Sequence, residues 1–367
     1  MRILIATGIY PPDVGGPATH SKKLAEEFSK IGWEVRIISY GNPSDSRVVG
    51  ISRKIPFGLR HLFYFLTCLR LAMKSDLIFA QDAAAAGLPA LLAAKILGKK
   101  FFVRIGGDLL WERVAGKGKT VLSFTEYYRN SQYLADRPAL FRLIRYVLRG
   151  AEKVIVVAPF LKEVYEKYYG VPGEKIKVIL NPVELGNFST NFSGEGDPVI
   201  LFTGRFVAYK NLKFLLRVFD GVRQKISRGR LILTGDGPEK EELIKFSKSL
   251  LSTAYIKILP SLSREKLLEK IKEAAVCVGP SFTEFNPNFI LECLSAGKPS
   301  LLSNENGLSV RLPEEFLFDP KNEQELEEKI IKLLQPEGFR WAVSAFSILP
   351  PGPNWQKVVE EYLKLFV

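Results

Sequence analysis

Short apolar runs alternate with amphipathic stretches along this chain, and the pattern occurs twice. In the first half the runs predict strands, and the stretches between them predict helices. One such stretch is 18–31, where Leu24, Phe28 and Ile31 recur at helical spacing. This alternation is typical of a parallel sheet covered by helices on both faces. The strands expected in the first half are 2–6, 34–39, 77–80, 100–105 and 153–157.

The same alternation restarts after Pro198, with strands expected at 199–202, 230–234, 256–259, 276–279 and 300–303. A length of 367 residues suits two domains rather than one core. The sequence therefore predicts an α/β protein with two Rossmann-like, doubly wound domains, whose ligands bind at the carboxyl ends of the strands, in the cleft between the domains. The expected boundaries are 1–181, a linker at 182–197 rich in Gly, Ser and Asn, a second domain at 198–350, and a terminal helical segment at 351–367.

Composition is that of a globular protein, with 47% apolar and 25% charged residues. Three widely spaced cysteines fit neither a disulfide framework nor a metal site, so a reducing cytoplasm is expected. The first six residues are typical of a buried strand rather than a signal peptide. No run of about 18 consecutive apolar residues is present, which argues against a transmembrane helix.

Positive charge is concentrated in the first half. Residues 1–170 hold 26 Lys+Arg against 14 Asp+Glu, whereas the remainder holds 26 against 25. A basic half attracts anionic lipid, phosphorylated substrates or nucleic acid, although a solvated surface explains it too. Nucleic acid is disfavoured because no nucleic-acid-binding motif is present. An apolar stretch at 59–73 with Arg60 and Arg70 predicts a helix that either docks on anionic lipid or is buried against the first sheet.

Two adjacent glycines, Gly15 and Gly16, follow the first expected strand and precede a helix. A backbone without Cβ approaches a ligand closely, and free helix N-terminal N–H groups favour a phosphate. An ordinary strand-to-helix turn explains these residues equally well. The loop matches neither the dinucleotide-binding nor the P-loop motif, which disfavours dehydrogenases and NTPases. His20 lies in the same helix, where packing or capping is the simpler role and a site near the cleft the alternative.

Two cations follow the first strand of the second half, Arg205 at the strand end and Lys210 at the next helix. An Arg and a Lys directed at one point suit a diphosphate and would neutralise charge on a leaving group. Two solvated surface cations are the alternative. Gly235 and Gly237 follow the next strand, in a turn that permits close backbone approach but is a weak signal alone.

The strongest segment runs from Pro280 to Pro299 and places Glu284 in a loop and Glu292 on the following helix. A loop carboxylate at that place can accept hydrogen bonds from sugar hydroxyls, and N–H groups near 286–289 can hold a phosphate. A capping carboxylate and a solvated glutamate are the alternative reading.

Taken together, these motifs resemble glycosyltransferase family 4 in order and spacing. The elements of the resemblance are Gly15-Gly16, Gly204-Arg205 with Lys210-Asn211, Gly235-Asp-Gly-Pro238, Glu284-x7-Glu292, and Ala296-Gly297-x-Pro299. The segment from Asn354 also looks like that family's last helix, which crosses back to the first domain. The resemblance covers nearly the whole chain and implies a GT-B fold.

It further implies a retaining hexosyltransferase that uses a UDP-, GDP- or ADP-linked sugar and needs no metal or other cofactor. Gly16, Arg205 and Lys210 would bind the diphosphate, Glu284 the donor sugar and Glu292 the ribose. The acceptor would be a glycan or lipid-linked molecule. The full donor set implied is Gly15, Gly16, Arg205, Lys210, Gly235, Gly237, Glu284, Phe285, Asn286, Asn288 and Glu292.

One departure concerns the position after the strand at 100–105, where many family members carry a histidine. This chain has Gly106-Gly107-Asp108 there. We hypothesise that Asp108 acts catalytically beside Glu284, Arg205 and Lys210. His20 and Arg104 are further acceptor candidates, although Arg104 faces either the acceptor or solvent. A non-catalytic nucleotide-sugar-binding protein and a sugar-nucleotide epimerase of the same fold stay open as alternatives.

Overall fold

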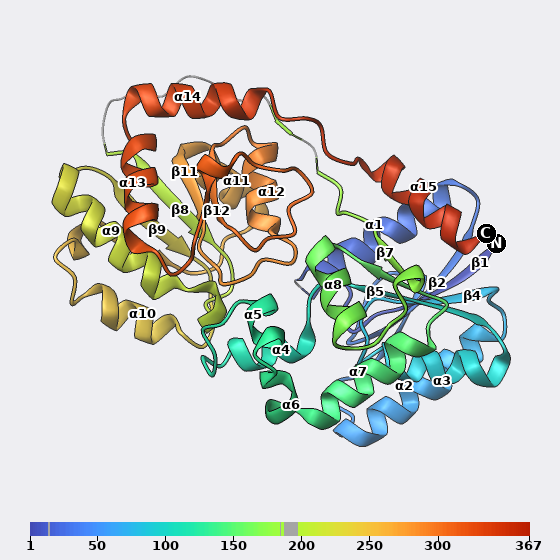
Figure 1. Ribbon diagram of the computed structural model, residues 1–367. Coiled ribbons are helices and arrows are strands. Elements are labelled where there is room, and N and C mark those ends of the chain that lie inside the picture. The colour runs from blue at the N-terminus through green and yellow to red at the C-terminus, as the bar shows by residue number, and fades with distance from the viewer. Residues whose placement is uncertain (14, 184, 187–196) are drawn as a thin grey trace. The chain divides into compact units, whose positions relative to one another are not determined.

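The computed structural model describes residues 1–13, 15–183, 185–186 and 197–367, which form two compact units. Unit 1 comprises Met1–Leu110, Tyr128–Asn181 and Asn354–Val367. Unit 2 comprises Trp111–Tyr127 and Pro182–Pro353. The linker expected at 182–197 lies largely outside the described residues. Each unit contains one parallel sheet with helices on both faces, which confirms the predicted α/β class (Figure 1).

The sheet of unit 1 has seven strands in the order β3-β2-β1-β4-β5-β6-β7, and all the paired strands are parallel. The strands are therefore added outward from β1 in both directions, first β2 and β3 on one side and then β4 to β7 on the other, as in a doubly wound fold. The strands are β1 (Arg2–Ala6), β2 (Glu34–Tyr40), β3 (Val48–Ile51), β4 (Leu77–Ala80), β5 (Lys100–Ile105), β6 (Lys153–Val156) and β7 (Ile176–Val178). The helices are α1 (Gly16–Lys30), α2 (Phe57–Ala72), α3 (Gly87–Leu97), α6 (Gln132–Asp136), α7 (Pro138–Gly150), α8 (Pro159–Lys167) and α15 (Trp355–Phe366).

One face of this sheet is covered by α1 together with α15, the last helix of the chain. Tyr362 and Phe366 of α15 pack on Phe79 of β4, with ring centroids 5.4 and 5.1 Å apart, and Phe366 lies 4.7 Å from Phe102 of β5. Helices α2, α3 and α7 pack side by side in the same unit, in the order α2-α3-α7. Burial of the aromatic stripe holds the C-terminal segment on unit 1, although it follows unit 2 in the sequence.

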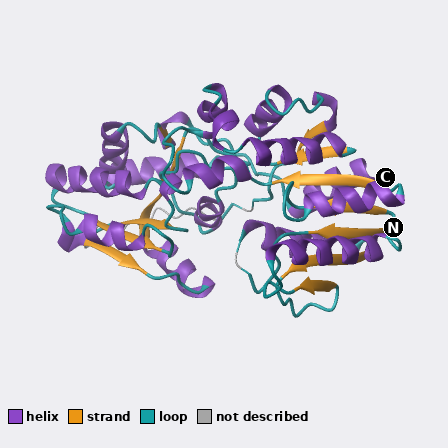
Figure 2. Ribbon diagram, turned by 90° about the horizontal axis from the view of Figure 1, so that it is seen from below, coloured by secondary structure: helices purple, strands orange, loops and turns teal. Residues whose placement is uncertain are grey.

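Unit 2 has six parallel strands in the order β10-β9-β8-β11-β12-β13. Its helices lie on both sides of the strands (Figure 2). The strands are β8 (Val199–Thr203), β9 (Arg230–Thr234), β10 (Ile256–Leu259), β11 (Ala274–Gly279), β12 (Ser300–Ser303) and β13 (Leu317–Phe318). The helices are α4 (Leu109–Ala115), α5 (Phe124–Arg129), α9 (Leu212–Ile226), α10 (Lys240–Ser247), α11 (Arg264–Glu273), α12 (Asn288–Ser295), α13 (Glu323–Leu333) and α14 (Pro336–Ser347), with α4 and α5 each crossing a unit boundary.

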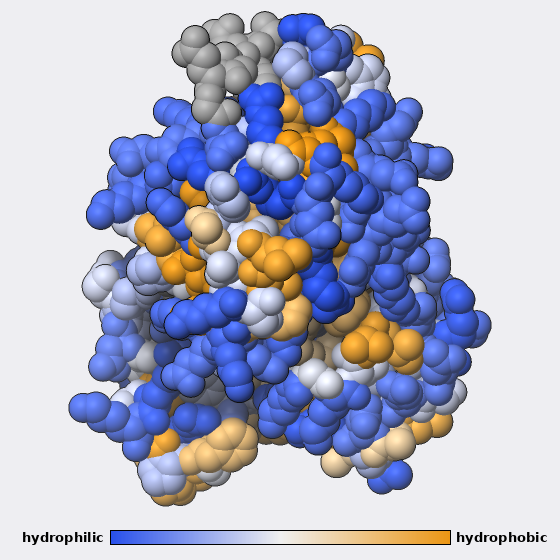
Figure 3. All heavy atoms as spheres, turned by 90° about the vertical axis from the view of Figure 1, so that its left-hand side faces the viewer, coloured by the Kyte–Doolittle hydropathy of each residue, from blue (hydrophilic) through white to orange (hydrophobic). Residues whose placement is uncertain are grey.

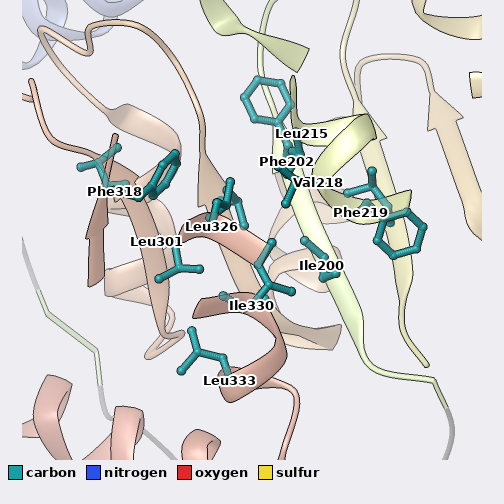
Figure 4. Packing of buried hydrophobic residues seen from close by; sticks show 14 of the residues in the cluster. Ile200, Phe202, Leu215, Val218, Phe219, Leu301, Phe318, Leu326, Ile330 and Leu333 are labelled. Atoms are coloured by element: carbon teal, nitrogen blue, oxygen red, sulfur yellow. The ribbon is translucent and has the colours of Figure 1, made fainter. Parts of the chain in front are cut away.

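The core of unit 2 forms where β8 packs against α9 and α13, which lie side by side. Ile200 and Phe202 of β8 meet Leu215 and Phe219 of α9, and Ile330 approaches from α13 (Figure 4). These side chains are fully or almost fully buried, as the 3.6-residue and 2-residue apolar periodicities require. Pro336 lies in the first turn of α14, where its missing N–H costs little.

The segment Trp111–Tyr127 departs from the domain expected at 1–181, because it packs within unit 2. The Trp111 indole lies 5.3 Å from the Tyr209 ring and 5.6 Å from the Phe285 ring, and Phe124 lies 5.0 Å from Phe285. The backbone N–H of Phe124 donates to Thr283 Oγ1 at 2.8 Å. The buried aromatic contacts and this hydrogen bond explain why the segment packs with unit 2.

Among the described residues, no helix is both long enough and apolar enough to cross a bilayer.

Candidate functional site

Three loops of unit 2 meet at one edge of its sheet, because β9, β8 and β11 are neighbours and parallel. Arg205 and Lys210 follow β8, the turn 235–238 follows β9, and Glu284 follows β11. The backbone joins the first two loops, since the Phe206 N–H donates to the Asp236 carbonyl at 2.8 Å. The structure thus brings together the cations, the glycine turn and the loop carboxylate that the sequence singled out.

Lys210 and Glu284 form the central ion pair of this edge. Lys210 Nζ lies 2.5 Å from Glu284 Oε1, and the side chains are only 16% and 11% exposed. Ser281 Oγ donates to the same carboxylate oxygen at 2.6 Å. A charge-assisted hydrogen bond in a poorly solvated place is stronger than a surface ion pair, so it fixes both side chains.

Arg205 is exposed and is oriented by Tyr209, whose hydroxyl accepts from Arg205 Nη2 at 2.8 Å. Burial raises the pKa of Tyr209 above its usual range, so its hydroxyl stays protonated. The Tyr209 carbonyl also accepts from the Phe282 N–H at 2.9 Å, which ties the Arg205 loop to the Glu284 loop. Tyr209 therefore links the two loops that carry the predicted donor contacts.

The turn 235–238 is so close to the preceding loop that it requires glycine. Gly235 has φ +154°, and a Cβ added there would lie 1.9 Å from the Gly204 carbonyl oxygen. A Cβ on Gly237 would lie 2.4 Å from the Phe206 carbonyl oxygen. Backbone packed this tightly forms a rigid floor at the ends of β8 and β9.

The loop after Glu284 leads directly into α12. Phe285 is buried against Trp111 and Phe124, Asn286 is partly buried, and Asn288 is exposed at the first position of α12. Glu292 lies further along α12 and is half-buried, and that burial raises the pKa of its carboxyl. Arg264 of α11 opposes this shift through its positive charge.

Sequence reasoning missed Glu305, which supports the Glu284 loop from outside the motif. Its carboxylate accepts from Thr283 Oγ1 at 2.6 Å and from Ser123 Oγ at 3.2 Å, and its carbonyl accepts from the Glu284 N–H at 3.0 Å. No local pattern marks Glu305, because its partners are far away in sequence. Ser281 was likewise not singled out, although it lies only three residues before Glu284.

The remaining predicted residues lie in unit 1, at the carboxyl ends of β1 and β5. Gly15 is the N-cap of α1 and Gly16 its first residue, and no side chain caps that helix end. Asp108 is buried, where it accepts hydrogen bonds from Tyr128 at 3.1 Å, Tyr169 at 3.2 Å and Tyr165 at 3.3 Å. A catalytic role for Asp108 stays a prediction. Its hydrogen bonds to the three tyrosines give Asp108 a role in stabilising the structure.

His20 and Arg104 are buried beneath α15. The His20 ring lies 5.5 Å from Trp355 and 6.3 Å from Tyr362, and Arg104 Nη2 donates to Asn181 Oδ1 at 2.7 Å. Burial, with the positive charge of Arg104, holds the pKa of His20 well below its usual range. His20 is thus neutral, and its packing against α15 matches the simpler of its two predicted roles.

Replacing His20 by glutamine should flatten the pH dependence of stability. Below about pH 6.5 the unfolded chain protonates His20 and the folded protein does not, so the free energy of unfolding falls with a slope that approaches about 1.4 kcal/mol per pH unit. His20→Gln removes this loss, which is measurable by urea denaturation between about pH 6.5 and pH 5.5. His61→Gln, at a partly buried histidine, is the matched control and should change the slope less. An unchanged slope in His20→Gln would contradict the buried neutral state.

Both halves of the chain match models of known protein families. Residues 14–187 match the family model described as Glycosyltransferase Family 4, and residues 187–344 match Glycosyl transferases group 1. An uncharacterized glycosyltransferase of Methanocaldococcus jannaschii is 25% identical, over 100% of this chain and 98% of its own length.

Two solved structures show the same fold over the whole chain. HepE of Anabaena, in complex with UDP and glucose, has a TM-score of 0.77 and 16% identity over 99% of this chain and 98% of its own. Sucrose-phosphate synthase of Thermosynechococcus elongatus has a TM-score of 0.73 and 18% identity over 100% and 98%. The two-sheet architecture is therefore the GT-B fold. With family matches that together span residues 14–344, this chain belongs to the group 1, family 4 glycosyltransferases.

Proposed function

We propose that this enzyme transfers a hexose from a nucleoside-diphosphate sugar to a glycan or lipid-linked acceptor, with retention at the anomeric carbon and without a metal ion. The observation that carries the proposal is the edge of unit 2 where Lys210, Arg205 and Glu284 meet the 235–238 turn. Two cations beside a tightly packed glycine turn suit a diphosphate, and a carboxylate beside them suits sugar hydroxyls.

In this proposal, Lys210 and Arg205 neutralise the charge that develops as the bond from the anomeric carbon to the diphosphate oxygen breaks. The acceptor oxygen forms its new bond on the same face, and its proton passes to the departing phosphate. Glu284, held by Lys210 and Ser281, orients the donor sugar rather than attacking it. Gly15 and Gly16, at the start of α1, keep their predicted phosphate contact, and Asn286 and Asn288, at the start of α12, keep theirs.

Glu292 is assigned to the ribose, because it is a half-buried carboxylate on the same helix that begins at the Glu284 loop. A ribose diol would replace the water that a carboxylate loses on burial with two hydrogen bonds. Asp108, His20 and Arg104 are buried, so their proposed acceptor role requires a rearrangement of α15 or of the tyrosines around Asp108.

The two alternatives differ from transfer in their products. An epimerase would convert the sugar nucleotide to its epimer without accumulating free nucleoside diphosphate. A binding protein would form neither an epimer nor free nucleoside diphosphate. The intact Lys210–Glu284 pair favours turnover over loss of activity. A cytoplasmic location with contact to an anionic membrane completes the proposal, and the basic first half of the chain supports it.

The first test is thermal shift with UDP, GDP and ADP, each with and without an attached sugar. A ligand at about 100 times its Kd stabilises the folded state by about 2.7 kcal/mol, so the matching nucleotide should raise Tm clearly. UDP is tried first because HepE was solved with it. Arg205→Ala and Glu292→Ala should abolish the shift, whereas Arg217→Ala, at an exposed pair with Glu323, should keep it. No shift from any nucleotide in folded protein would count against the donor site.

A further inference from the structure

Helix α2 exposes an apolar stripe instead of burying it. Leu59, Leu62, Phe63 and Leu66 recur at i, i+3, i+4 and i+7, which places them on one face of the helix, and each is about half exposed. Phe57 precedes them and is 70% exposed. The opposite face of α2 is apolar as well, and its buried members are Tyr64, Cys68 and Ala72. Helix α2 therefore packs on the rest of unit 1 with one apolar face and leaves its other apolar face exposed.

The two helices that follow α2 across the unit also expose apolar side chains. Helix α3 packs beside α2 and exposes Ile96 by 63%. Helix α7 packs beside α3 (Figure 1). Lys95 Nζ of α3 donates to Tyr146 Oη of α7 at 3.0 Å and lies 4.5 Å from the centre of that ring. Tyr146 is itself exposed. The three helices thus form one surface, which we call the α2–α3–α7 face.

Every charged residue within the segments that carry this face is basic, although Arg53 pairs with Asp13 and Asp136 directly precedes Arg137. The segments 53–74, 87–100 and 137–150 contain twelve Lys and Arg and no Asp or Glu. Asp76, just beyond α2, is paired with Arg2 at 3.1 Å. The twelve cations are Arg53, Lys54, Arg60, Arg70, Lys74, Lys95, Lys99, Lys100, Arg137, Arg142, Arg145 and Arg149.

Exposed apolar side chains elsewhere are arranged differently. In unit 2 the two most exposed are Leu251 and Ile348, which lie in turns far apart in the sequence. Figure 3 shows the molecular face at the left of Figure 1, where hydrophilic residues dominate and apolar ones form small separate groups. The α2–α3–α7 face thus differs from the face in Figure 3, because it combines a run of exposed apolar side chains with basic segments.

We propose that the α2–α3–α7 face docks on the surface of an anionic lipid bilayer. A bilayer interface offers hydrocarbon to the α2 stripe and anionic headgroups to the flanking cations at the same depth. Long Lys and Arg side chains reach headgroups while their stems stay among apolar groups. The stripe lies along the helix, so α2 lies in the interface plane. This inference rests on the membrane contact in the proposed function and names the face that makes it. The face contains none of the residues assigned to the donor, so vesicle binding and donor turnover can fail separately.

The test is flotation of the purified full-length protein with vesicles of phosphatidylcholine alone or mixed with phosphatidylglycerol. We expect binding to the mixed vesicles, and strong weakening between about 0.1 M and about 1 M salt because screening shortens the reach of the cations. Leu62→Ser with Phe63→Ser should weaken vesicle binding roughly tenfold or more. Leu251→Ser with Ile348→Ser, at apolar residues exposed in unit 2, should leave it unchanged.

A second pair of variants tests charge without touching the apolar stripe. Arg142→Glu with Arg145→Glu on α7 should lower binding on the order of tenfold or more, and Lys257→Glu with Lys272→Glu in unit 2 should have a much smaller effect. The melting temperature of each variant separates lost docking from lost folding. Equal binding to both vesicle types, or equal losses in test and control variants, would overturn the proposal. So would a wild-type dimer in solution that Leu62→Ser with Phe63→Ser converts to monomer.

Discussion

Replacing Lys210 by alanine is expected to lower donor turnover on the order of 10²–10³-fold, because the leaving diphosphate loses a preorganised cation in a poorly solvated place. The rate is measured as release of nucleoside diphosphate from the sugar nucleotide that gives the thermal shift. Glu284→Gln keeps the volume and the contact to Ser281 but removes the charge, and it should lower turnover as well.

The matched control is Lys213→Ala. Lys213 lies three residues further on and pairs with Glu242 at 2.5 Å, but both side chains are well exposed, and neither is in the predicted donor set. Turnover should stay within about threefold of wild type, since exposed ion pairs contribute about 1 kcal/mol or less. If Lys210→Ala kept wild-type turnover while folded, the proposed diphosphate site would be wrong.

Gly235→Ala should damage both stability and donor binding. The new Cβ would overlap the Gly204 carbonyl oxygen, and the backbone would keep a φ of +154° that side chains rarely adopt. Overpacking and backbone strain each cost about 1–3 kcal/mol, so we expect a loss of about 3–5 kcal/mol in unfolding free energy. Urea denaturation measures this loss, and the nucleotide-induced shift in Tm should disappear.

Gly98→Ala separates strain from overlap. Gly98 caps α3 with φ +61°, and a Cβ there would meet nothing within 4 Å. This variant should cost about 1–2 kcal/mol, from the left-handed backbone alone, and should keep the nucleotide response. Similar losses in both variants would show that the contact between the 204 and 235 loops matters little.

Much of the donor edge could be predicted because parallel strands impose it. Once β8, β9 and β11 are recognised as strands of one sheet, the residues after them must lie at one edge. Arg205, Gly235 and Glu284 each follow such a strand, so the sequence brought them together without knowledge of any contact. Their roles toward substrate stay predictions, since those depend on a ligand.

The missed strands and the partners of the site had no comparable local signal. The edge strands β7 and β13 have only three and two residues, which is too short for an apolar period to stand out, and β3 contains Gly50, which weakens a strand pattern. Glu305 and Trp111 act on the Glu284 loop from distant parts of the chain. Their positions follow from packing, which a local pattern does not encode.

The sequence by itself determined the two doubly wound sheets, the order of the motifs and the basic first half, because periodicity and composition are local properties. The tertiary structure decided three further things: the Lys210–Glu284 pair, the placement of Trp111–Tyr127 in unit 2, and the exposure of the α2 stripe. The last is the clearest case, since an apolar helix at 59–73 was compatible with a buried or a lipid-facing position. Which face a helix buries depends on the neighbours that cover it, and these come from elsewhere in the chain.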